Sequence, residues 1–203
     1  MAGRVDAVVF DLGRVLIGVD TGALAARLAA HTTRSAQDML RTPEARALAE
    51  AYETGRTETD AFCRDMISAL GLDLGPEDFA RVWTGIFTRW PDMEALFAEV
   101  RARAAVAILS DTNPLHWRAI QALAPPLAAP DAVGLSYRIG ACKPDPATYA
   151  AVVRALGAAP ERCVFVDDLD ANVRGARRAG MRAFRHTDAR ASRERLLDML
   201  GDG

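Results

Sequence analysis

Cysteine is scarce in this sequence, and neither sign of charge is in clear excess. The 203 residues include three cysteines, Cys63, Cys142 and Cys163, which form neither a metal-ligand spacing nor an even set for disulfides. The formal net charge of −2 gives no electrostatic sign of nucleic-acid binding. No apolar run is long enough to cross a bilayer, and no secretory pattern opens the chain. We therefore expect a cytoplasmic protein that binds neither nucleic acid nor membranes.

Three short apolar runs each end in an acidic or hydroxyl residue. The runs come directly before Asp11, Ser110 and Asp167. Short β-branched runs are typical of buried parallel strands. Because ligands bind beyond the carboxyl ends of the strands in an open α/β sheet, we expect these residues to converge on one polar, anionic pocket. Carboxylates crowd together only where positive charge compensates them, and a divalent cation with a lysine nearby is the simplest source of that charge.

The chain changes character between about Asp20 and Trp90. Ala, Leu, Arg and Glu predominate there, apolar residues recur at helical spacing, and strand signals are almost absent. The spacing predicts helices over residues 21–30, 43–52, 57–70 and 76–87. Elsewhere strands and helices alternate, which predicts a parallel sheet covered on both faces. We expect an α/β, Rossmann-like core from residues 1–16 and 92–203, with an α-helical insertion at residues 17–91.

Asp11 and Lys143 each have an ordinary interpretation and a functional one. A carboxylate at the end of a strand often bonds to the backbone of a turn, and a lone surface lysine is usually solvated. As a functional group, Asp11 could attack phosphorus and form an aspartyl-phosphate. Lys143 precedes Pro144 at an expected helix entrance, where its ammonium could neutralise that carboxylate and a phosphoryl oxygen.

Polar clusters follow the two later apolar runs. Residues 110–114 read Ser-Asp-Thr-Asn-Pro, which suits a helix cap, but a hydroxyl and free N–H groups at a helix start also bind phosphate. Asp167, Asp168 and Asp170 place three acids within four positions. Helix capping accounts for one of them. Magnesium takes carboxylate oxygens as ligands, so metal binding is the better interpretation of this cluster.

The order of these features resembles that of the haloacid dehalogenase-like hydrolase superfamily, most of whose members are phosphatases. The matching segments are Phe10-Asp11-Leu12-Gly13, Leu109-Ser110-Asp111-Thr112-Asn113, Lys143-Pro144 and Phe165-Val166-Asp167-Asp168. The resemblance covers nearly the whole chain, since the helical insertion is similar to the inserted cap of that family. Within the superfamily, the chain looks most similar to the branch with Asp-Leu-Gly in the first segment, which includes sugar-1-phosphate phosphatases.

The resemblance implies a magnesium-dependent phosphatase of a small phosphorylated metabolite. Asp11 would attack phosphorus, and water would then hydrolyse the aspartyl-phosphate. The residues implied for the metal are Asp11, the backbone carbonyl of Gly13, Asp168 and, as a ligand or a support, Asp167. The residues implied for catalysis are Asp11, Ser110 and Lys143, and those implied for substrate binding are Ser110, Asp111, Asn113 and Lys143. No motif identifies the metabolite, and we expect a monomer or a homodimer.

Gly13 departs from the commonest pattern of that family. An aspartate usually stands there, two residues after the nucleophile, and acts as general acid and then as base. Glycine has no side chain to move a proton, so we expect slow turnover or a leaving group that needs little protonation, as in a sugar-1-phosphate or an acyl phosphate. Related chains often carry Asn at the position of Asp111. Either Asp111 or Asp20 could partly replace the missing acid and base.

Two alternative functions remain open. A 2-haloacid dehalogenase also uses an aspartate nucleophile but needs no metal. Against it, Asp167 and Asp168 would repel an anionic substrate if no cation compensated them. Gly13 is also compatible with a catalytically weak binding or regulatory protein of the same fold. Metal-dependent hydrolysis of a phosphomonoester would separate the three.

Overall fold

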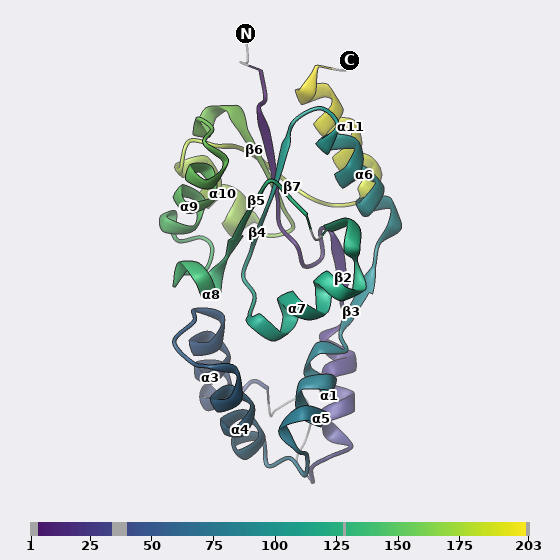
Figure 1. Ribbon diagram of the computed structural model, residues 1–203, viewed down its shortest axis with the longest axis vertical. Coiled ribbons are helices and arrows are strands. Elements are labelled where there is room, and N and C mark those ends of the chain that lie inside the picture. The colour runs from purple at the N-terminus through teal and green to yellow at the C-terminus, as the bar shows by residue number, and fades with distance from the viewer. Residues whose placement is uncertain (1–3, 34–39, 128, 202–203) are drawn as a thin grey trace.

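A parallel sheet forms the centre of the structure, a computed structural model that describes residues 4–33, 40–127 and 129–201 (Figure 1). In spatial order its five strands are β5 (Ala132–Leu135), β4 (Ala105–Ser110), β1 (Ala7–Phe10), β6 (Cys163–Asp167) and β7 (Arg182–Arg185). Every neighbouring pair is parallel. The chain winds in one direction from β1 to β5 and in the other from β6 to β7. In such sheets the crevice beside the reversal point is where ligands bind.

Helices cover both faces of this sheet, as the sequence predicts. One face packs against helices α6 (Pro91–Arg101), α7 (Pro114–Leu123) and α11 (Ala189–Leu200), and the other against α9 (Pro146–Leu156) and α10 (Asp170–Arg178) (Figure 1). Successive strand side chains alternate between the faces, so Val8 and Phe10 join the first core cluster while Val9 joins the second. Because both faces are buried, the strands are apolar throughout rather than at every other residue.

The helices between Asp20 and Gly85 form a lobe of their own. Among the described residues they are α1 (Thr21–Ala29), α3 (Pro43–Glu53), α4 (Thr59–Leu70) and α5 (Pro76–Thr84). Figure 1 shows this helical lobe at the end of the molecule opposite the two termini, next to the carboxyl ends of the sheet strands. Phe62, Phe79 and Trp83 pack together inside it, in an apolar cluster distinct from the two that flank the sheet. The lobe therefore has a core separate from that of the sheet.

A short antiparallel ribbon joins the helical lobe to the rest of the chain. It consists of β2 (Ile17–Val19) and β3 (Phe87–Arg89), and it was not predicted. The expected helix over residues 76–87 was wrong at its end, because α5 stops at Thr84 and Phe87 pairs with Val19. That partner is distant in sequence, and no local pattern of side chains indicates it.

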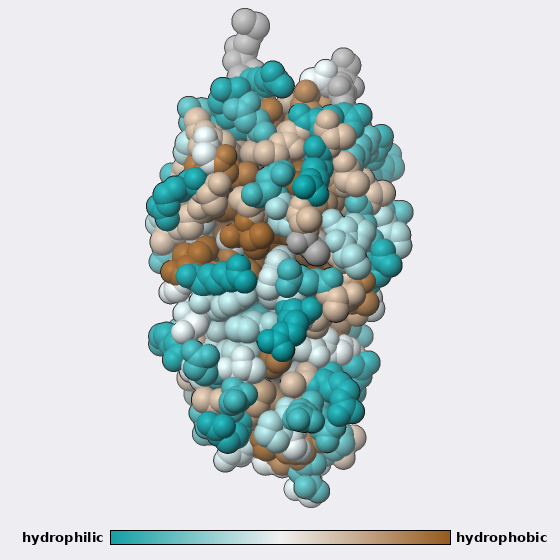
Figure 2. Space-filling model, viewed as in Figure 1, coloured by the Kyte–Doolittle hydropathy of each residue, from teal (hydrophilic) through white to brown (hydrophobic). Residues whose placement is uncertain are grey.

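The remaining elements are short, and the surface is largely polar. Helix α8 (Ser136–Ile139) follows β5, and single 3₁₀ turns occur at Pro125–Leu127 and Pro160–Arg162. In the view of Figure 2, hydrophilic residues cover most of both ends of the molecule, and apolar ones gather near the middle. No helix in the described part of the chain combines the length and the apolar character needed to span a membrane.

Candidate active site

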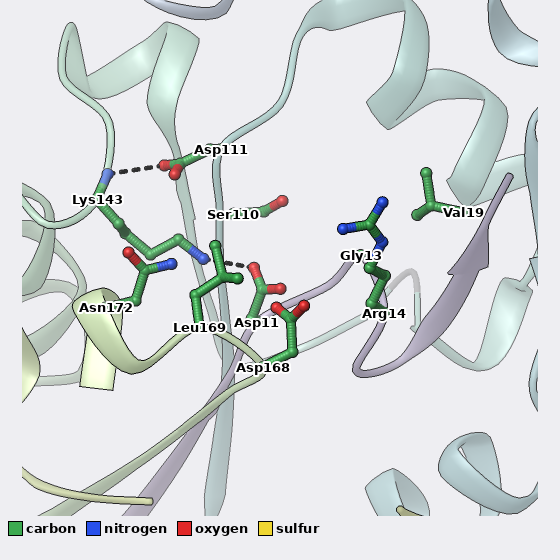
Figure 3. Close-up of a pocket in the computed structure, with 10 residues that line it drawn as sticks. All are labelled: Asp11, Gly13, Arg14, Val19, Ser110, Asp111, Lys143, Asp168, Leu169 and Asn172. Carbon is green, nitrogen blue, oxygen red and sulfur yellow. Dashed lines mark hydrogen bonds and ion pairs between the residues drawn. The ribbon is translucent and has the colours of Figure 1, made fainter. Parts of the chain in front are cut away.

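The carboxyl ends of three adjacent strands bring the predicted polar residues together (Figure 3). Asp11 directly follows β1, and its backbone N–H donates to the carbonyl of Val166 at 2.8 Å. Ser110 is the last residue of β4, and Asp167 is the last residue of β6. Since β1 pairs with both β4 and β6, these three positions lie at the same edge of the sheet. The apolar strands therefore determine where the polar side chains meet.

Lys143 inserts its ammonium group between two of the carboxylates. The Nζ atom lies 2.5 Å from Asp11 Oδ1 and 2.9 Å from Asp167 Oδ2, and it also donates to the carbonyl of Leu109 at 3.2 Å. The lysine side chain is only 2% exposed. Burial alone would lower the pKa of Lys143, but the charges of Asp11 and Asp167 raise it above its usual value. The backbone N–H of Lys143 is held by Asp111 Oδ1 at 2.9 Å, which fixes the loop that carries the ammonium group.

Asp168 completes an acidic cluster with Asp11 and Asp167. One carboxylate oxygen from each lies within 4.8 Å of the others. Three ionised carboxylates outnumber the ammonium group of Lys143, and the charge of nearby Arg14 offsets part of the excess. Burial raises the pKa of Asp11 to about 7 even though Lys143 opposes that change, and burial with repulsion from Asp167 also raises the pKa of Asp168. This crowded set of hard oxygen donors fits a divalent metal ion.

Asp167 has less freedom than the other two carboxylates. Besides Lys143, it accepts hydrogen bonds from Asn172 Nδ2, at 3.1 and 3.0 Å to its two oxygens, and from the N–H of Leu169 at 2.8 Å. Its side chain is fully buried. These bonds occupy both oxygens of Asp167, so this residue fixes the position of Lys143, while Asp11 and Asp168 keep oxygens directed to the pocket.

The cluster opens into a pocket of about 210 Å³ (Figure 3). The structure brings six of the predicted site residues to its wall, and Asp167 lies directly behind them. The lining residues are Asp11, Gly13, Arg14, Val19, Ser110, Asp111, Lys143, Asp168, Leu169 and Asn172. The pocket is therefore built from the strand ends, the turn after β1, the end of β2, the loop that carries Lys143 and the start of α10.

Two predicted residues are engaged elsewhere. Asn113 Oδ1 accepts a hydrogen bond from the N–H of His116 at 3.0 Å and caps α7, so the residue does not line the pocket. Asp20 Oδ1 accepts from the N–H of Ala23 at 2.8 Å and caps α1. In both cases the ordinary interpretation of a polar residue before a helix describes the side chain.

Arg14 and Asn172 line the pocket although the sequence did not single them out. Arg14 has a positive φ of 61°, rare for a residue with a side chain, and no pattern indicates that conformation. Asn172 lies on the first turn of α10, where its amide faces back to Asp167. For Lys143, which was predicted, the sequence holds a further signal: it is the only lysine in a sequence with 24 arginines. A compact ammonium fits between two buried carboxylates where a planar guanidinium would not.

The chain combines a doubly wound α/β sheet with a lysine-paired aspartate and an acidic cluster at the carboxyl edge of the sheet. The model of the haloacid dehalogenase-like hydrolase family matches residues 5–180. The chain belongs to that family.

Two similar proteins also support membership of this family. The chain is 32% identical over 198 residues to a protein named Phosphatase MT3486 from Mycobacterium tuberculosis, covering 89% of this chain and 86% of that one. It is 24% identical to a D-ribitol-5-phosphate phosphatase from Bacteroides thetaiotaomicron, covering 95% and 97% of the two chains.

A solved structure supports the fold. A HAD family enzyme from Bacteroides thetaiotaomicron superposes with a TM-score of 0.85 at 21% identity, covering 91% of this chain and 95% of that chain. That enzyme has also been crystallised with magnesium and inorganic phosphate.

Proposed function

We propose that this protein is a magnesium-dependent phosphatase that hydrolyses a small phosphorylated metabolite through an aspartyl-phosphate at Asp11. The observation that carries the proposal is the bond from Lys143 Nζ to Asp11 Oδ1 beside the acidic cluster. Family membership supports it, as do the names of the relatives. The magnesium and phosphate in the structurally similar enzyme are also consistent with it.

Asp11 is the nucleophile in this proposal. One of its oxygens forms a bond to phosphorus while the bond from phosphorus to the leaving oxygen breaks. Lys143 orients the carboxylate and balances the negative charge of the transferring group. Ser110 and the N–H groups of the following turn hold phosphoryl oxygens. Water then attacks the phosphorus of the aspartyl-phosphate, which releases inorganic phosphate and restores Asp11.

The residues assigned to the metal are Asp11, Asp168 and the backbone carbonyl of Gly13, with Asp167 in support. Asp167 is given the supporting role because Lys143 and Asn172 already hold its oxygens. Bound magnesium would supply positive charge to the phosphoryl oxygens. Without such a cation the pocket would repel its own substrate, since the carboxylates outnumber the two cationic side chains, Lys143 and Arg14. The same repulsion disfavours a metal-independent dehalogenase.

The site lacks the usual acidic residue that would donate a proton to the leaving group. Gly13 lines the pocket and offers no acidic group. Asp111 lines the same pocket, and burial raises its pKa, whereas the carboxylate of Asp20 caps a helix. We assign to Asp111 whatever acid catalysis the site retains. Residues 17–91 serve as a cap that limits access of water to this pocket.

A panel of phosphomonoesters tests the function. The purified protein is assayed on sugar-1-phosphates, polyol phosphates and an acyl phosphate, with magnesium and with a chelator, and on a 2-haloacid without metal. We expect hydrolysis of at least one phosphate ester only when magnesium is present. Release of halide without metal, or phosphate release that a chelator leaves intact, would contradict the proposal.

Replacing Asp168 with Asn should weaken magnesium binding. One charged ligand is lost, so the magnesium concentration for half-maximal activity is expected to rise about tenfold or more. Asp170→Asn is the matched control, because that acid lies two positions further on and pairs with Arg185 at 3.5 Å outside the cluster. Magnesium titration of both variants checks the prediction. Equal shifts in both, or none in Asp168→Asn, would count against the assigned metal site.

A further inference from the structure

A second cavity, of about 290 Å³, adjoins the pocket at Asp11. The two share Gly13, Val19, Ser110 and Asp111, so a molecule whose phosphate lies beside Asp11 can extend into the second one. Much of its remaining wall is apolar and comes from the helical lobe and α7. We call it the inner cavity. Its position makes it the space for the leaving group.

The inner cavity carries negative and not positive charge. None of the described residues that line it is a lysine or an arginine, whereas two of them, Glu53 and Asp111, are acidic. Arg14 lines the pocket at Asp11 but not the inner cavity. His116 is part of the wall, but burial lowers its pKa to about 4, so its ring is neutral near pH 7. A leaving group with a second negative charge would meet two carboxyl groups and no cation.

Two polar groups of the inner cavity lack partners. Glu53 is the last residue of α3, and its carboxyl makes no hydrogen bond or ion pair with any residue that the structure describes. Trp83 is 6% exposed, and its indole N–H has no acceptor in the described part of the chain. A buried polar group without a partner is costly, which applies to the indole N–H of Trp83, whereas Glu53 is half-buried. Both residues line the inner cavity, and we take Glu53 as the acceptor and Trp83 as the donor for a ligand there.

A hydroxyl group matches both requirements, because it donates one hydrogen bond and accepts others. The apolar wall suits a carbon skeleton. The volume lies just below the range of drug-sized ligand sites, which suits a short chain rather than a nucleoside. The chemistry therefore favours a small, hydroxyl-bearing and otherwise uncharged leaving group.

We propose that Glu53 and Trp83 are specificity-determining residues that bind hydroxyl groups of a short polyol phosphate and reject leaving groups that carry a second negative charge. The proposal rests on the phosphatase function above, because it takes the phosphate to lie at Asp11. Glu53 supplies both the hydrogen bond and the repulsion. Trp83 supplies the complementary donor.

A matched pair of substrates isolates the effect of charge. D-ribitol 5-phosphate and 5-phospho-D-ribonate have the same chain length, but the second ends in a carboxylate. We expect wild-type protein to prefer the first in kcat/KM. Glu53→Gln removes the charge and keeps the shape. The preference for D-ribitol 5-phosphate is therefore expected to fall about tenfold, mainly because kcat/KM for 5-phospho-D-ribonate rises. Glu50→Gln, on the same helix but outside the cavity, should leave the preference intact.

The dependence of this preference on pH gives a second readout. Burial, with the charges of Asp111 and Glu50, raises the pKa of Glu53 to about 7. The preference for D-ribitol 5-phosphate should therefore increase between pH 6 and pH 8 in wild type and change less in Glu53→Gln, in which only Asp111 still charges the cavity. The ratio cancels the titration of Asp11 and of the substrate phosphate, which both reactions share. Cys142, Asp111, Glu50 and His116 also face this region, and the Gln variant retains all of them.

Trp83→Phe provides an independent variant. It keeps a ring in the stack with His116 and removes the N–H, so kcat/KM for the polyol phosphate is expected to fall about three- to tenfold while the preference is kept. Circular dichroism verifies that each variant folds. An unchanged preference in a folded, active Glu53→Gln, or a wild-type preference for 5-phospho-D-ribonate, would overturn the specificity proposal but not the phosphatase function. A wild-type protein that hydrolyses no phosphate ester would overturn both this and the phosphatase function.

Discussion

Asp11→Asn is expected to lower turnover of the preferred phosphate ester at least about a thousandfold. The amide has nearly the shape of the carboxylate but is not a nucleophile toward phosphorus, so the covalent step is lost rather than slowed. It also removes a charge that Lys143 contacts. Steady-state phosphate release, measured at saturating magnesium, checks this prediction.

The fold of Asp11→Asn should survive, because the substitution removes a carboxylate from a cluster in which three repel one another. Unfolding by denaturant provides the control for that expectation. Asp170→Asn serves again as the catalytic control, since its side chain lies outside the cluster. A folded Asp11→Asn that retains a tenth or more of wild-type turnover would exclude Asp11 as the nucleophile.

Of the single substitutions proposed for this protein, Lys143→Met is expected to lower the free energy of unfolding most. Removing the ammonium leaves Asp11 and Asp167 buried without their cation, and breaking a buried ion pair in this way costs about 3–5 kcal/mol. Denaturant unfolding in the presence of a chelator measures the change. Turnover should also fall sharply, because nothing then balances the charge of the transferring group.

Two further variants separate the charge of Lys143 from its shape. Lys143→Arg keeps the charge but needs more space, so it should lose less stability than Lys143→Met. The double variant Asp11→Asn, Lys143→Met should recover part of the loss, because one of the stranded carboxylates is gone. Additive effects of the two single substitutions would show that Lys143 and Asp11 are not coupled, contrary to the geometry.

The sheet and most of the site were predictable from the sequence, for one physical reason. Parallel strands buried on both faces are apolar along their whole length, so the polar residue that ends each run marks the edge of the sheet. Asp11, Ser110 and Asp167 were placed in this way. Pairing of β1 with both β4 and β6 then brings them together.

The parts that could not be predicted depend on contacts between distant segments. Phe87 was assigned to a helix because its strand partner, Val19, lies far away in sequence. Glu53 and Glu50 lie on the same helix and look alike in the sequence, yet only Glu53 lines the inner cavity. For Asn113 two roles fitted equally well, and its hydrogen bond to His116 shows it capping a helix. Pairing of β2 with β3 decides the first case and the position of the helical lobe the second, whereas the cap at Asn113 is local to α7.

The stereochemical course at phosphorus tests the central claim most directly. Each in-line displacement inverts the configuration, so attack by Asp11 followed by attack of water predicts overall retention. The measurement uses a substrate whose phosphoryl group is chiral through oxygen isotopes, hydrolysed in isotopically labelled water with magnesium present. Retention is the result expected for a covalent aspartyl-phosphate. Inversion would show a single attack by water and would contradict Asp11 as the nucleophile.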